Sequence, residues 1–182
     1  MKVTRSKLSG CLIIEPEIFY DDRGFFQETF SESKYASIGI DLPFVQDNHS
    51  RSKKGVLRGL HYQLKKPQGK LVRVIMGSII DVAVDIRLGS PTFSQYQLVK
   101  LTAENRKIFY IPPGFAHGYL VLSNNSIVLY KCTNTYDPDD EYGIKWDDNE
   151  IGINWKNKNP ILSKRDANLP LLKNQQFLPK FT

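Results

Sequence analysis

Short runs rich in β-branched and aromatic residues follow one another along most of this chain, separated by turn signals about every 8–12 residues. The clearest are residues 72–76 and 80–86, which alternate between two faces on either side of Gly77 and Ser78 and therefore predict a hairpin. Further strands are expected at residues 95–101, 107–111, 117–122 and 126–133. Strands of this length and spacing are typical of an antiparallel sandwich or barrel, so the sequence predicts an all-β fold.

The rest of the chain offers little helix. Residues 31–38 predict one short helix with Ser31 as its N-cap. From about residue 154 the chain is rich in Asn, Lys and Pro, and we expect this segment to wrap the barrel without much regular structure. The chain has 182 residues and no linker, so we expect one domain over residues 1–182 that buries roughly 70% of its unfolded surface.

The net charge of +6 favours an anionic partner, and nucleic acid is the first candidate to weigh. The densest basic stretch, residues 51–54, is accompanied by no helix-turn-helix, zinc-finger or RNA-binding motif. We therefore expect a small anionic ligand and no nucleic acid. The apolar run at residues 11–14 is too short for a signal sequence or a membrane span, and Cys11 and Cys132 have no metal-binding spacing. A cytoplasmic protein with reduced thiols and no membrane contact is expected.

Three histidines are present, and each lies in a cluster of polar residues, at residues 44–50, 55–63 and 112–117. Histidine transfers protons near neutral pH and also binds metals, so these clusters indicate acid–base chemistry or a metal site. The segment 55–63 carries Arg58 and His61 inside an apolar, strand-like run, where burying either side chain has a cost unless it is used.

A metal site is the first alternative. Residues 112–117 are similar to the Pro-x-Gly-x-x-His segment of jelly-roll cupins, which also bind metal through a His-x-His pair and a glutamate. Here Gln63 stands where the second histidine of that pair would be, and Lys70 lies where the acidic ligand is expected. A lysine repels a divalent cation, and an amide is a weak substitute for imidazole. The sequence therefore predicts no bound metal.

Proton transfer is the second alternative. His61 would be a general base, Lys70 a cation facing a developing oxyanion, and Tyr130 the acid. Each residue also has a purely structural interpretation. His61 and Tyr130 would be hydrogen-bonded core residues, and Lys70 would be a buried cation paired with Asp81. The residue spacing alone leaves both interpretations open.

Arg58 and His61 are an odd number of positions apart, so a regular strand would point them to opposite faces. Both can reach one cavity only if the strand bulges or twists near Gly59. If the two residues serve one site, the sequence predicts an irregular strand at this point.

Two more residues suit an anionic ligand. Arg23 lies in a glycine-containing turn ahead of a strand that carries Glu28, and it fits either a phosphate or an ordinary solvated surface. Tyr136 follows the strand of Tyr130 and fits either stacking on a flat ring or covering the core.

Six segments, taken together and in this order, resemble one protein family: residues 21–26 (DDRGFF), 46–50 (QDNHS), 57–63 (LRGLHYQ), 68–73 (QGKLVR), 112–118 (PPGFAHG) and 129–131 (LYK). The chain is similar to the dTDP-4-dehydrorhamnose 3,5-epimerases over about residues 6–171. This resemblance implies a double-stranded β-helix (jelly roll, cupin-like) with short peripheral helices, assembled as a homodimer without metal or cofactor. The implied reaction converts dTDP-4-dehydro-6-deoxy-D-glucose to dTDP-4-dehydro-L-rhamnose, on the route to dTDP-L-rhamnose.

The resemblance also implies catalytic roles. His61 matches the family's proton-abstracting base, and Asp166 matches the carboxylate that pairs with this base. Tyr130 matches the proton donor, and Lys70 matches a residue near the reacting carbonyl.

The remaining matches are to substrate-binding residues. His117 matches a residue near the reacting carbonyl, and Tyr136 resembles the aromatic residue that stacks on the thymine. Arg165 stands where some members have lysine, which keeps a charge for the diphosphate. The other residues implied to bind the nucleotide sugar are Arg23, Phe26, Glu28, Gln46, Asn48, Arg58 and Glu141.

The implied chemistry explains these residue types. Carbons 3 and 5 flank the ketone at carbon 4, so a base can remove their hydrogens and leave an enolate that a cation stabilises. An acid on the opposite face then returns a proton and inverts the centre. Three alternatives remain open: an epimerase that inverts one carbon or uses a related dTDP-sugar, a metal-dependent cupin enzyme, and a binding protein without activity.

Overall fold

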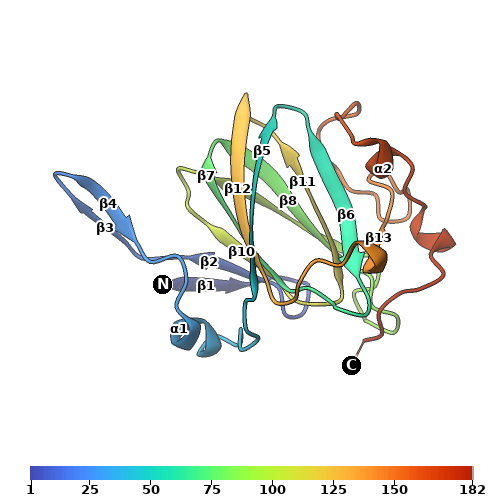
Figure 1. Ribbon diagram of the computed structural model, residues 1–182, viewed down its shortest axis with the longest axis horizontal. Coiled ribbons are helices and arrows are strands. Elements are labelled where there is room, and N and C mark those ends of the chain that lie inside the picture. The colour runs from blue at the N-terminus through green and yellow to red at the C-terminus, as the bar shows by residue number, and fades with distance from the viewer. Residues whose placement is uncertain (182) are drawn as a thin grey trace.

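The computed structural model describes residues 1–181 and consists of two antiparallel sheets, a separate hairpin and short helices (Figure 1). The six-stranded sheet contains, in spatial order, β1 (Lys2–Arg5), β2 (Leu12–Glu15), β10 (Ile108–Ile111), β7 (Lys70–Met76), β12 (Asn125–Cys132) and β5 (Gln46–Lys53). The five-stranded sheet contains β13 (Glu141–Gly143), β6 (Leu57–Gln63), β11 (Phe115–Val121), β8 (Ser78–Asp85) and β9 (Tyr96–Thr102). Strands far apart in sequence are neighbours in both sheets, which is the arrangement of a jelly roll, and the all-β, cupin-like prediction is confirmed.

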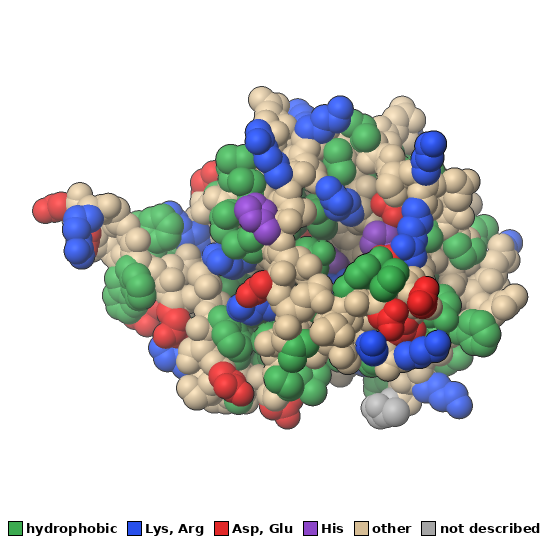
Figure 2. Space-filling model, in the orientation of Figure 1, with side chains coloured by type: hydrophobic (Ala, Val, Ile, Leu, Met, Phe, Trp, Pro, Cys, Tyr) green, Lys and Arg blue, Asp and Glu red, His purple; other side chains and the backbone are tan. Residues whose placement is uncertain are grey.

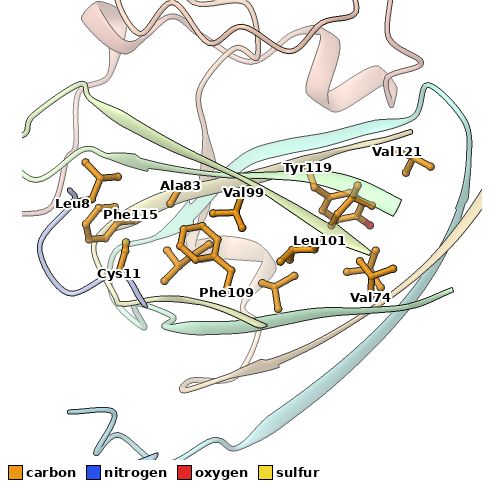
Figure 3. Close-up of a cluster of buried hydrophobic side chains, with 14 residues drawn as sticks. Leu8, Cys11, Val74, Ala83, Val99, Leu101, Phe109, Phe115, Tyr119 and Val121 are labelled. Carbon is orange, nitrogen blue, oxygen red and sulfur yellow. The ribbon is translucent and has the colours of Figure 1, made fainter. Parts of the chain in front are cut away.

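The central core lies between the two sheets. Val74 of β7 faces Val99 and Leu101 of β9, and Phe109 of β10 packs among them (Figure 3). All four side chains are buried, because inward positions alternate with outward ones along each strand. Burial of each side chain of this size stabilises the fold by roughly 1.5–3 kcal/mol.

The outer face of the five-stranded sheet is also covered. Ile144, Trp155 and Leu172 pack on it and form a second buried cluster with Leu57 and Val82. Both faces of β8 are therefore buried, which explains why residues 79–84 of this strand are nearly all apolar.

The predicted hairpin at residues 72–86 is wrong, although both strands exist. β7 pairs with β10 and β12, whereas β8 pairs with β9 and β11 in the other sheet. The turn at Gly77 therefore carries the chain from one sheet to the other. Gly77 has a φ of +78°, and a Cβ at this position would collide with Asn125 O and Ser123 Oγ. Alternation and a glycine turn cannot distinguish a hairpin from this crossover, because both need the same residues.

The helices are short and peripheral. α1 (Glu32–Ala36) follows Ser31, which occupies the predicted N-cap position without a side-chain capping bond. The C-terminal segment contains α2 (Lys164–Ala167) and the 3₁₀ helix η2 (Leu172–Asn174), and it lies along the five-stranded sheet (Figure 1). None of the helices in residues 1–181 is long and apolar enough to cross a membrane. The interpretation of the chain as one domain stays a prediction.

A hairpin of β3 (Ile18–Asp21) and β4 (Gly24–Gln27) projects from the barrel (Figure 1). Its aromatic side chains are largely exposed. Arg106, in the β9–β10 turn, lies 4.2 Å from the ring centre of Phe25 and donates a 2.9 Å hydrogen bond to the Tyr20 hydroxyl.

Candidate active site

A cavity of about 470 Å³ opens between the two sheets and is closed on one side by α2. Ionisable side chains of both signs, with histidine among them, gather beside the C-terminal segment on the face shown in Figure 2. The predicted site residues that line the cavity are Arg58, His61, Lys70, His117, Tyr130, Tyr136, Glu141, Arg165 and Asp166. An adjoining hollow of about 280 Å³ adds Gln46 and Asn48.

An irregularity in β6 brings Arg58 and His61 to the same cavity. His61 lies opposite His117 in β11, but Arg58 lies opposite Tyr119, so the pairing register shifts by one residue between them. Gly59 has a φ of +120°, and a Cβ there would collide with the backbone of Gly118. The predicted bulge near Gly59 is confirmed, and it explains why this position is a glycine.

His61 is held by a carboxylate from the C-terminal segment. Its Nε2 lies 2.7 Å from Asp166 Oδ1, and the Asp166 amide donates to Ser163 Oγ at the start of α2. Burial raises the pKa of Asp166, but hydrogen bonds from His61 and Ser163 outweigh this effect and hold it below its usual value. An ionised Asp166 can only accept, so His61 carries its proton on Nε2 and keeps Nδ1 free to accept one.

Lys70 and Tyr130 face His61 from the other sheet. Lys70 begins β7 and Tyr130 lies in β12, and both line the same cavity as His61 of β6. Burial lowers the pKa of Lys70, and no carboxylate of residues 1–181 lies within 4.0 Å of its ammonium group. Burial also raises the pKa of Tyr130 to about 12, so this phenol stays protonated at neutral pH. The site therefore has a candidate base on one wall, with a cation and an acid on the other.

Asp81 pairs with His117 and not with Lys70. His117 Nε2 lies 2.8 Å from Asp81 Oδ1, and both side chains are buried. The structural interpretation of Lys70 as the partner of Asp81 is thus wrong. Asp81 of β8 and His117 of β11 lie on neighbouring strands of one sheet, which brings the carboxylate to the imidazole.

The donor set around these histidines does not suit a metal. The Nε2 atoms of His61 and His117 are each engaged by a carboxylate. The amide of Gln63 donates to Lys66 O at 2.8 Å and to Thr135 O at 3.2 Å, which ties this side chain to the neighbouring loops. Within residues 1–181, no group of three His, Cys, Asp or Glu side chains is placed to hold a metal ion.

The two arginines of the cavity differ. Arg58 donates only to the Ser52 hydroxyl, from Nε at 3.2 Å and Nη2 at 3.1 Å, and so remains without an acidic partner in the described chain. Arg165 pairs with the side-chain carboxylate of Glu141. It also donates a hydrogen bond from Nη2 to the backbone oxygen of Glu141 at 2.8 Å. Arg58 is therefore the freer anion-binding group.

Tyr136 lies half exposed at the rim of the cavity. Its backbone N–H donates to Gln46 Oε1 at 2.7 Å, and its hydroxyl donates to Glu141 Oε2 at 2.8 Å. These bonds orient the ring while the residue stays half exposed, which is compatible with stacking on a base.

Three predicted site residues do not reach the cavity of their own chain: Arg23, Phe26 and Glu28. Arg23 pairs with Asp21 at 2.6 Å, and Glu28 pairs with Lys34 at 2.9 Å. Phe26 is exposed on the projecting hairpin. The hairpin stands away from the barrel, so these residues do not line this chain's own cavity, and their substrate-binding role stays a prediction.

Sequence reasoning missed the hydroxyl groups of the cavity. Ser50 and Tyr119 both line it, and their hydroxyls lie 2.9 Å apart. The signal was present in β5, where Gln46, Asn48, Ser50 and Ser52 alternate with exposed residues. Period-two alternation from Gln46 would have placed Ser50 on the inward face.

The fold defines a cupin-like protein, and the ionisable groups around its cavity suit acid–base chemistry on a small ligand. Comparison with known proteins gives the family. The family model for dTDP-4-dehydrorhamnose 3,5-epimerase matches residues 5–174. The dTDP-4-dehydrorhamnose 3,5-epimerase of Shigella flexneri is 50% identical over 170 residues, which cover 92% of this chain and 94% of that protein.

Two solved structures are similar over nearly their full lengths. The dTDP-6-deoxy-D-glucose-3,5-epimerase of Legionella pneumophila, in complex with dTDP-4-keto-L-rhamnose, is 48% identical with a TM-score of 0.97, covering 100% of this chain and 98% of that one. The 3′-monoepimerase ChmJ of Streptomyces bikiniensis, in complex with dTDP-quinovose, is 34% identical with a TM-score of 0.90, covering 96% and 91%. This chain belongs to the dTDP-4-dehydrorhamnose 3,5-epimerase family and is an isomerase of dTDP-rhamnose biosynthesis.

Proposed function

We propose that this enzyme inverts carbons 3 and 5 of dTDP-4-dehydro-6-deoxy-D-glucose and releases dTDP-4-dehydro-L-rhamnose, using neither metal nor cofactor. The observation that carries the proposal is the division of the site between two sheets. His61 comes from the five-stranded sheet, Lys70 and Tyr130 come from the six-stranded sheet, and all three line one cavity. Inversion needs a base and an acid on opposite faces of the sugar ring, and opposite walls of a cavity supply them.

Each inversion begins at His61. Nδ1 removes the hydrogen from a carbon beside the ketone, and the resulting imidazolium is stabilised by Asp166 on Nε2. The electron pair moves onto the ketone oxygen, where the ammonium group of Lys70 stabilises the enolate. Tyr130 then donates its phenolic proton to the opposite face of the same carbon.

The nucleotide part of the substrate would lie toward the rim. Arg58, which has no acidic partner among the described residues, would bind the diphosphate, and Tyr136 would stack on the thymine. Arg165, Glu141, Gln46 and Asn48 would complete this end of the site. Diphosphate binding also accounts for the net charge of +6 without invoking nucleic acid.

The working unit would be a homodimer. Phe19, Tyr20, Phe25 and Phe26 are each more than half exposed on the projecting hairpin, a concentration of aromatic surface that a partner would cover. A second copy is the partner that fits. In such a dimer, each chain could lend Arg23, Phe26 and Glu28 to the cavity of the other, which would restore the substrate-binding role that the resemblance implies.

The main alternative is an epimerase that inverts only one carbon, and the likeness to ChmJ favours it as the second candidate. Incubation with dTDP-4-dehydro-6-deoxy-D-glucose in deuterated water tests both. The proposal predicts deuterium at carbons 3 and 5 and an L-configured product by NMR. Deuterium and inversion at one carbon would favour the alternative. Activity that chelation abolishes and zinc, iron or manganese restores would instead favour a metal-dependent enzyme.

The product would enter dTDP-L-rhamnose synthesis in the cytoplasm and serve a surface polysaccharide. Loss of rhamnose from the surface glycan of a deletion strain, with its return on complementation, is the result that this setting predicts.

A further inference from the structure

Two inversions on one sugar pose a problem of proton return. Each inversion moves one proton from carbon to His61 and another from Tyr130 to carbon. His61 is then protonated and Tyr130 is deprotonated. Before the second carbon can react, His61 must lose its proton and Tyr130 must regain one from water, while the nucleotide sugar still occupies the cavity. This requirement follows from the proposed function, on which the inference rests.

Glu141 is placed between the base and the rim. Its Oε1 lies 3.8 Å from His61 Nδ1, the nitrogen that is free to accept a proton. Its Oε2 accepts a 2.8 Å hydrogen bond from Tyr136, which is half exposed, and pairs with Arg165. One carboxylate oxygen therefore faces inward and the other faces the solvent side.

No other acid has this position. Among residues 1–181, only Asp166 and Glu141 have carboxylate oxygens within 4.0 Å of His61. Asp166 is buried and already accepts the hydrogen bond from Nε2–H of His61. Among the other groups in the cavity, Lys70 as an ammonium has no acceptor site, and His117 is held by Asp81 through its Nε2. Tyr130 lies on the opposite wall, so the sugar would separate it from His61.

We propose that Glu141 carries the proton from His61 to solvent between the two inversions. Nδ1–H of the imidazolium gives its proton to Oε1, which regenerates neutral His61 and leaves Glu141 as the carboxylic acid. Glu141 then gives the proton to water or to a buffer base and returns to the carboxylate. The gap of 3.8 Å exceeds a hydrogen bond, so transfer needs a movement of about 1 Å or one bridging water.

The ion pair with Arg165 and the hydrogen bond from Tyr136 both engage Oε2, which leaves Oε1 of Glu141 directed toward His61. Glu141 thus has a second role besides the substrate binding that the resemblance implies.

Two variants of Glu141 test the relay with different readouts. Glu141→Gln keeps the size of the side chain but accepts no proton, so it should slow the second inversion more than the first. Singly inverted sugar should then accumulate during turnover, as read by NMR. Glu141→Ala opens space for a small carboxylate, so sodium formate should restore kcat in a saturable manner after a fall of at least roughly 10-fold.

Tyr136→Phe is the matched control, because it removes a hydrogen bond to Glu141 while leaving the carboxylate in place. Its activity should not respond to formate, and it should not accumulate singly inverted sugar. Thermal unfolding shows whether each variant folds.

The relay is wrong if folded Glu141→Gln slows both inversions equally. It is also wrong if formate fails to restore folded Glu141→Ala, or if formate stimulates Tyr136→Phe to the same extent. Failure of the wild-type enzyme to epimerise the sugar at all would instead overturn the proposed function.

Discussion

His61 Nε2 lies 2.7 Å from Asp166 Oδ1, although the two residues are 105 positions apart in the chain. The contact joins β6 to the short helix α2, so the C-terminal segment completes the site as well as covering the barrel. This pair fixes which ring nitrogen of His61 is available to the substrate.

Replacing Asp166 by Asn should therefore damage catalysis more than binding. An amide can donate to Nε2 and so favour the tautomer that carries its proton on Nδ1, where the base must be free. We expect kcat to fall by at least roughly 10²-fold with a small change in KM. Steady-state kinetics with the dTDP-sugar measure this. A normal kcat in folded Asp166→Asn would show that the pair does not set the base.

A second acid, Asp85, predicts how stability depends on pH. Asp85 is fully buried, and although burial raises its pKa, hydrogen bonds from Arg87, Ser90 and Thr92 lower it from 3.8 to about 2. A depressed native pKa gives stability that is present above the unfolded value and is lost as the pH falls through about 2.

Asp85→Asn should therefore lower the free energy of unfolding by about 2 kcal/mol at pH 7, and by less at pH 3. Denaturant unfolding at both pH values measures the difference. Asp22→Asn, at an exposed acid, serves as the control and should change little at either pH. An equal loss at both pH values for Asp85→Asn would indicate a packing effect and not a charge effect.

The projecting hairpin predicts how assembly and substrate binding are linked. The active enzyme should have the mass of a dimer by light scattering at micromolar concentration. Arg23→Ala should raise KM more than it lowers kcat, because it removes a contact made equally in ground and transition states, and added salt should weaken dTDP binding. Lys100→Ala, at an exposed cation on β9, is the control. A monomeric active enzyme, or an unchanged KM in Arg23→Ala, would contradict this arrangement.

Much of the fold could be predicted because period-two alternation and glycine turns mark individual strands well. The pairing of strands could not, as residues 72–86 illustrate, because the same local pattern serves a hairpin and a crossover between sheets. The bulge at Gly59 was predictable, since two functional residues with odd spacing had to share one cavity.

The site was predictable where residues lie within motifs, and less so where contacts depend on tertiary structure. Lys70 lines the cavity, but Asp81, its partner in the structural interpretation, binds His117. Which acid reaches which cation depends on sheet order, and local sequence does not reveal that order. Likewise, the distance of Arg23 from the cavity depends on the direction of a hairpin.

The division of roles between His61 and Tyr130 is the central claim, and deuterium exchange in the two single variants tests it most directly. His61→Ala should lose both exchange at carbons 3 and 5 and epimerisation by at least roughly 10²-fold, because no enolate forms. Tyr130→Phe, which keeps the ring volume, should retain some exchange while net inversion falls much further, because the enolate forms but is not protonated on the opposite face. Near-normal exchange in folded His61→Ala, or inversion at the wild-type rate in Tyr130→Phe, would contradict the account.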